Sequence, residues 1–73
     1  MSRLPALRPR ELIAALKKDG FIESHQTGSH LSLVHSDGRR VIIPIHAKDI
    51  PRGTMSAIIK RTGLTDDRIR ELL

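Results

Sequence analysis

The tripeptide Gly28-Ser29-His30 places a histidine directly after a glycine turn, at the start of a strand-like run. An imidazole takes up or releases a proton near neutral pH, so a fixed, partly exposed histidine is a candidate general acid or base. Gly28 and Ser29 allow an RNA backbone to approach closely. The chain is also basic, with a formal charge of +5. A proton carrier in a small basic protein favours RNA as the substrate.

Four cations that flank the expected second helix are the candidates for contact with RNA phosphates: Lys48, Arg52, Lys60 and Arg61. The N-terminal end of that helix could hold a phosphate as well. For any single one of these cations, a solvated helix face is the slightly favoured interpretation. Phe21 is the single aromatic residue and is expected in the core, so recognition of RNA would rest on backbone charge and shape.

Other chemistries find little support. A zinc site built from the four histidines is disfavoured because strand alternation spreads them over both faces of the sheet: His25, His30, His35 and His46. Ser29 and Ser32 lack a nucleophile elbow, and Gly28 belongs to no phosphate-binding loop. Neither a metal nor a small-molecule cofactor is expected.

The length of 73 residues predicts one domain spanning 1–73, near the lower limit for a self-supporting core. The chain contains no cysteine, which fits a reducing compartment. No apolar stretch approaches the ~20 residues that span a bilayer, and no signal-peptide pattern opens the chain. A soluble cytoplasmic protein without membrane contact is expected.

The helical segments carry clear start and stop signals. A first helix is expected from Pro9 to about Asp19, because proline suits the first helical position and apolar residues recur at helical spacing. Gly20 supplies a left-handed cap, and Phe21 can fold back on Leu16.

Two more helices are expected in the last third of the chain. One runs from about Gly53 or Thr54 to Thr62 and ends at Gly63. A short final helix follows Thr65, which is a suitable N-cap.

Strand signals fill the middle of the chain. A first strand is expected over Phe21–Gln26, followed by a turn at Thr27-Gly28. Asp37-Gly38 predicts a two-residue type I′ turn that joins the second and third strands. That turn predicts the facing pairs Ser36–Arg39, Val34–Val41, Ser32–Ile43 and His30–Ile45. The fold class is therefore α+β, in the order α-β-β-β-α plus a short C-terminal helix, with a three-stranded antiparallel sheet packed on helices.

This register makes both faces of the sheet rich in apolar residues. One face is expected to collect His30, Ser32, Val34, Val41, Ile43 and Ile45. The other is expected to collect Leu31, Leu33, His35, Arg40, Ile42 and Pro44. The helices can cover only one face, so the other would present an apolar patch of the kind that marks partner sites.

The ordered set of motifs resembles the HicA toxins of bacterial and archaeal toxin–antitoxin systems. The similarity covers nearly the whole chain and rests on the following segments: Leu16-Lys17-Lys18-Asp19-Gly20-Phe21, Gly28-Ser29-His30, His35-Ser36-Asp37-Gly38-Arg39-Arg40-Val41, Ile43-Pro44, Gly53-Thr54-Met55 to Ile58-Ile59-Lys60, and Gly63-Leu64.

The resemblance implies a double-stranded-RNA-binding-domain-like fold and endoribonuclease activity on mRNA (an mRNA interferase). It places the family's Gly-Ser-His histidine at His30 and implies a HicB-type antitoxin that blocks it, for which the surplus apolar face of the sheet is the expected docking site. The chain departs from the pattern at Leu31 and Leu33, where such families often carry a further histidine or an aromatic residue.

An endoribonuclease is the hypothesis that the sequence favours, and two alternatives remain open. In the favoured hypothesis, His30 acts as general base or acid at a scissile phosphate, with the second proton carrier unassigned. In the first alternative, the chain is a catalytically inactive module that binds RNA or a protein. In the second, it is a purely structural protein–protein adaptor. The oligomeric state, a homodimer included, is also open.

Overall fold

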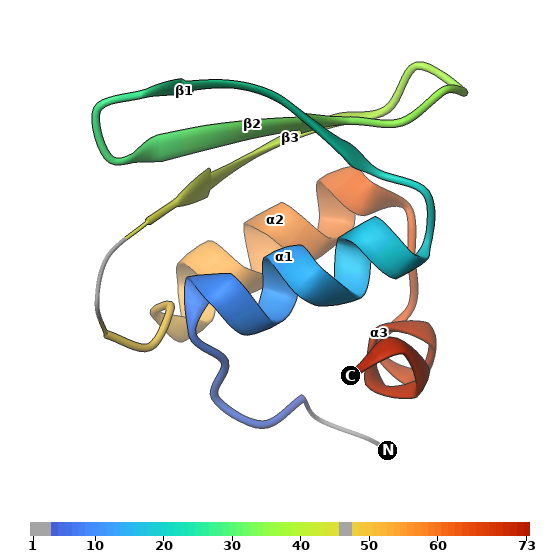
Figure 1. The fold of residues 1–73 in the computed structure, drawn as a ribbon. Helices are drawn as coiled ribbons and strands as arrows, with labels where there is room; N and C mark the ends of the chain where they lie inside the picture. Colours follow the sequence, from blue (N-terminus) through green and yellow to red (C-terminus); the bar gives the residue numbers. More distant parts are fainter. Residues whose placement is uncertain (1–3, 46–47) are drawn as a thin grey trace.

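The computed structural model describes residues 4–45 and 48–73, and in these ranges three helices lie on one side of a three-stranded sheet (Figure 1). The elements are α1 (Pro9–Lys18), β1 (Ile22–Thr27), β2 (His30–Val34), β3 (Arg40–Pro44), α2 (Arg52–Thr62) and α3 (Asp66–Leu72). The sheet is antiparallel in the order β1-β2-β3. The α+β class and the order of elements expected from the sequence are confirmed.

The ends of α1 follow from local side-chain chemistry. Pro9 occupies the first helical position, and Glu11 accepts a hydrogen bond from the backbone N–H of Arg8 at 2.8 Å. At the other end, the N–H of Phe21 donates to the carbonyl of Leu16 at 3.0 Å, which is the closing bond of a Schellman motif. After α1 the chain therefore enters the sheet directly, at Phe21, whose side chain is buried.

The C-terminal helices also match their sequence signals. The structure begins α2 at Arg52, slightly earlier than expected, and ends it at Thr62, with Gly63 as the C-cap. The Thr65 hydroxyl accepts a hydrogen bond from the backbone N–H of Arg68 at 3.1 Å and caps α3. None of the helices in the described part of the chain combines the length and the hydropathy that crossing a bilayer requires.

The expected pairing of β2 with β3 is wrong by one residue. His30 pairs with Pro44 instead of Ile45, and the whole strand follows: Leu31↔Ile43, Ser32↔Ile42, Leu33↔Val41 and Val34↔Arg40. The reason is that the turn has three residues rather than two. The N–H of His35 donates to the carbonyl of Arg39 at 2.8 Å, so Ser36, Asp37 and Gly38 form the loop. Gly38 closes it with φ +99°, as in a type I turn followed by a bulge.

The shift of one residue decides which side chains enter the core, because side chains alternate along a strand. The helix-facing side of β2 and β3 consists of four buried residues: Leu31, Leu33, Val41 and Ile43. They pack with residues of the helices that include Leu12, Leu16, Ile58 and Ile69. The expectation of two apolar faces is therefore wrong. The second side of the sheet, hereafter the open face, is mixed in character and has no helix over it (Figure 1).

Candidate functional site

The turn before His30 is held firmly in place. Gly28 has φ +57° and takes the first position of a two-residue loop between Thr27 and His30, as in a type II′ turn. The side-chain amide of Gln26 donates to the Gly28 carbonyl at 3.0 Å. The Ser29 carbonyl accepts a hydrogen bond from the N–H of Ile45 at 2.5 Å, which ties the turn to the end of β3. The backbone that carries His30 is thus fixed from both sides.

His30 points to the open face. It forms register pairs with Thr27 on β1 and Pro44 on β3, while the next residue, Leu31, is buried against the helices. Since neighbouring side chains on a strand point to opposite faces, the imidazole lies on the side that no helix covers. His30 is exposed, so a ligand on this face can reach its ring.

His25 lies on the same face as His30. It pairs with Ser32, and Ser32 stands two residues from His30 on β2, which places all three side chains on the open face. Ser32 is only 4% exposed, and its hydroxyl has no hydrogen-bond partner among the described residues. Leaving a buried polar group unpaired costs about 1–3 kcal/mol. The sequence reasoning missed this cluster because it depends on the pairing of β1 with β2.

The four predicted RNA-binding cations do not gather at one place. Lys48 lies three residues beyond Ile45, so the chain keeps their Cα atoms within about 11 Å, and Arg52 begins α2 at this end of the molecule. Lys60 and Arg61 lie in the last turn of α2. At a rise of about 1.5 Å per residue, that turn is roughly 14 Å from Arg52. Lys48 and the start of α2 are therefore at the His30 end, but the Arg52 side chain lines a pocket with Leu4 and Asp66 instead of the open face.

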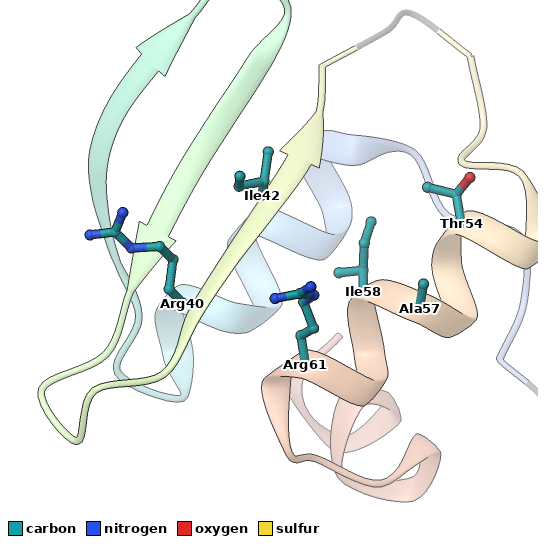
Figure 2. Close-up of a pocket in the computed structure, with 6 residues that line it drawn as sticks. All are labelled: Arg40, Ile42, Thr54, Ala57, Ile58 and Arg61. Atoms are coloured by element: carbon teal, nitrogen blue, oxygen red, sulfur yellow. The ribbon is translucent and has the colours of Figure 1, made fainter.

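Arg61 instead lines a groove together with Arg40, which the sequence did not predict as an RNA contact. This groove of about 350 Å³ runs between β3 and α2, and Arg61 reaches toward it from the helix while Arg40 projects from the start of the strand (Figure 2). Ile42, which is 54% exposed, lines it together with Thr54, Ala57 and Ile58. Neither arginine forms an ion pair with a carboxylate in the described part of the chain. Two unpaired guanidinium groups at one groove favour an anionic ligand.

A second polar cluster lies at the opposite end of the sheet and is structural. The Arg39 guanidinium donates to the Thr62 carbonyl and, at 2.8 Å, to Asp37, and it lies 5.1 Å from the centre of the Phe21 ring. It also lies 3.6 Å from a carboxylate oxygen of Asp19. Arg39 therefore connects the ends of α1 and α2 to the β2–β3 turn.

His35 belongs to this structural cluster. Its Nε2 lies 3.1 Å from the Asp19 carbonyl, and its Nδ1 accepts from the backbone N–H of Asp37 at 3.2 Å. The ring also packs edge-on against Phe21. Both ring nitrogens are thus engaged within the fold, which separates His35 from the exposed His25 and His30.

The histidines do not form a metal site in the described ranges. No group of three or more histidine, cysteine, aspartate or glutamate side chains within 4–45 and 48–73 is arranged to hold a metal ion. His46, the remaining histidine of the zinc alternative, lies outside the described residues.

Comparison with known proteins adds one family. A model described as the HicA toxin of bacterial toxin–antitoxin systems matches residues 9–64, from the first residue of α1 to just beyond α2. No curated protein matches the chain. The matched range contains the open face, the groove between β3 and α2, and the structural cluster around Arg39.

Proposed function

Because the chain belongs to the HicA family of toxins of bacterial toxin–antitoxin systems, we propose that it is an endoribonuclease that cleaves mRNA, with His30 as a proton carrier at the scissile phosphate. The observation that carries the proposal is the fixed, exposed position of His30 on the open face. A general acid or base must lie within hydrogen-bond reach of the reacting atom, and no helix bars that approach.

The chemistry that suits one imidazole beside RNA is attack by the neighbouring ribose. His30 removes the proton from a 2′-hydroxyl, the 2′-oxygen bonds to the adjacent phosphorus, and the bond from phosphorus to the 5′-oxygen breaks. The products are a 2′,3′-cyclic phosphate and a 5′-hydroxyl. Proton transfer by a positioned side chain contributes ~10²–10⁴-fold to the rate of such a step.

Binding of RNA is proposed to use backbone charge. Gly28 has open space where a Cβ would stand, so a strand can lie close to the turn that Ser29 completes. We expect Lys48 to meet a phosphate near His30 and Arg52 to meet the strand where it passes the start of α2. Lys60 and Arg61 would meet the strand farther along α2. These contacts neutralise phosphates without reading bases.

An antitoxin is the expected protein partner of a toxin from this family. We propose that it is of the HicB type, that it covers His30, and that both proteins act in the cytoplasm, where mRNA is available. Its contact surface is the mixed open face, because the strands carry one apolar-rich face, and the helices cover it.

The substitution His30→Ala tests the activity. We expect RNA cleavage to fall by ~10²–10⁴-fold while RNA binding is retained. The side chain is exposed, so the substitution removes the proton carrier and leaves the fold intact. Cleavage of a labelled RNA and its binding are measured on the same preparations. Lys18→Gln, an exposed change at the end of α1, serves as the control with unaltered cleavage.

Three outcomes decide against the proposal. Unchanged cleavage by His30→Ala removes this residue from the mechanism. Cleavage of a substrate that lacks the 2′-hydroxyl at the scissile position excludes attack by the ribose. If the wild-type protein binds RNA and never cleaves it, the catalytically inactive binding module is the better description.

A further inference from the structure

Cleavage by ribose attack requires two proton transfers on opposite sides of the phosphorus. The 2′-oxygen loses a proton as it attacks, and the 5′-oxygen gains one as it leaves. His30 can perform only one of these transfers at a given moment. A second proton carrier on the same face would complete the reaction that is proposed above.

We propose that His25 is this second carrier and that it protonates the leaving 5′-oxygen. Thr27 pairs with His30, and His25 lies two residues from Thr27 on the same strand. The two histidines are therefore diagonal neighbours on one face, with Cβ atoms roughly 7–8 Å apart or somewhat less. A phosphate lying between the rings would have an oxygen within ~3 Å of each imidazole.

An irregularity in β1 places His25 on this face. The register shifts between Glu23, which pairs with Leu33, and His25, which pairs with Ser32. Without the extra residue in β1, His25 would stand opposite Leu31 and point toward the helices. Bulges of this kind re-aim side chains and are frequent beside active sites. The irregular pairing between Glu23 and His25 thus puts His25 on the face that carries His30.

The unpaired hydroxyl of Ser32 is an independent sign of a ligand site. Ser32 lies directly across from His25 and two residues from His30, and its buried Oγ has no partner among the described residues. A fold optimised for stability alone would place a small apolar residue there, because an unpaired buried hydroxyl is destabilising. A rotated His25 ring or a bound phosphate oxygen would satisfy it.

The proposed reaction balances in atoms and charge. His30 begins as neutral imidazole and takes the 2′-hydroxyl proton, while the 2′-oxygen forms its bond to phosphorus. His25 begins as imidazolium and gives its proton to the 5′-oxygen as the bond from phosphorus to that oxygen breaks. Both rings are exposed, so exchange with water restores their starting states.

The decisive experiment uses two substrates with the substitution His25→Gln. One is ordinary RNA, and the other carries sulfur in place of the 5′-oxygen at the scissile bond, since a thiolate leaves without being protonated. We expect His25→Gln to cleave ordinary RNA at least ~10²-fold more slowly than the wild type and to cleave the sulfur substrate at nearly the wild-type rate. His30→Ala should stay slow on both substrates.

The matched control is Glu23→Gln, which changes the same strand on its other face. It should cleave both substrates like the wild type, and all variants should keep the wild-type circular dichroism spectrum. A slow His25→Gln variant that the sulfur substrate does not rescue would mean a role other than leaving-group protonation. The assignment is also overturned if His25→Gln cleaves ordinary RNA at the wild-type rate. It is overturned as well if the sulfur substrate restores cleavage by His30→Ala and not by His25→Gln.

These results are distinguishable from failure of the proposed function. If His30→Ala is inactive and His25→Gln is fully active, only the second carrier is excluded and the endoribonuclease stands. If the wild-type protein cleaves neither substrate, the endoribonuclease itself fails, and with it the role of His25.

Discussion

Two histidines at opposite ends of the β2 region differ in what surrounds their rings. The Nδ1 of His35 accepts the Asp37 backbone N–H, so the neutral ring carries its proton on Nε2 and donates it to the Asp19 carbonyl. His30 has an exposed ring on the open face. Spacing alone could not assign these roles, because both residues lie beside polar turn residues, one at the start and one at the end of the same strand run.

Asp37 offers a pH test of the structural cluster. Its carboxylate accepts hydrogen bonds from the backbone N–H and then the side chain of Arg39, at 3.1 and 2.8 Å, and these bonds hold the pKa of Asp37 below its ordinary value of 3.8. A carboxyl group with a lowered pKa stabilises the folded state above its unfolded pKa. That contribution disappears as the pH falls through the folded pKa.

Asp37→Asn should therefore lower the melting temperature at neutral pH and have little effect in strong acid. Asparagine keeps an acceptor oxygen but has no charge, so the difference from the wild type isolates the carboxylate. Thermal unfolding is followed from neutral pH to below pH ~3 at low salt, where exposed charges are least screened. A difference in melting temperature between the wild type and Asp37→Asn that does not change with pH would contradict this role of the carboxylate.

At the scale of elements, the β2–β3 turn controls the sheet. Its three-residue loop, closed by Gly38 at φ +99°, sets the pairing of His35 with Arg39 and hence every pair along both strands. A two-residue loop would have put Ser32 opposite Ile43 and mixed polar residues into the core. The turn thus determines which face carries His30.

Gly38→Ala should lower the free energy of unfolding by about 1–2 kcal/mol, because a Cβ is disfavoured at this positive φ. No atom lies within 4 Å of the added Cβ, so the effect isolates the backbone conformation. Gly53→Ala is the matched change, at an equally open position inside α2, and should raise stability by about 0.4–1 kcal/mol. Denaturant unfolding measures the change in the free energy of unfolding for both variants. Changes of the same sign would refute the prediction.

At the scale of the whole molecule, the layered arrangement leaves one side of the sheet without a helix over it (Figure 1). The three helices lie on one side of the sheet, with α1 and α2 against β3 and α3 packed on α1 (Figure 1). His30 on β2 and Arg40 on β3 both lie on the open face. Pro44 pairs with His30, and Arg40 stands four residues earlier on β3, roughly 13 Å away. A strand of a few nucleotides spans this distance. On the proposed function, we expect the groove to hold a phosphate remote from the scissile bond.

Removing the charges of the groove should weaken RNA binding in a way that depends on salt. Arg40→Gln and Arg61→Gln should each lower affinity and reduce the slope of log affinity against log salt concentration by about one, the signature of a lost phosphate contact. Lys18→Gln removes a charge from α1, away from the open face, and should leave the slope unchanged. Equal slopes in all three variants would exclude the groove from the RNA path.

The sequence by itself determined the elements whose signals are local. Pro9 and the Gly20-Phe21 ending bound α1, and Thr65 caps α3, because each of these interactions joins residues within one helical turn. The Gly28 turn placed His30 at the start of a strand for the same reason. The sequence also predicted the family, because the resemblance rests on the order of such motifs along the chain.

The tertiary structure alone decided which residues share a face. Side chains alternate with a period of two, so one residue more in a turn, or one more in β1 before His25, moves a side chain to the opposite side of the sheet. That Arg40 and Arg61 line one groove likewise depends on how α2 packs beside β3. Such pairings join distant segments, and their geometry is set by the packing of the whole core rather than by neighbouring residues.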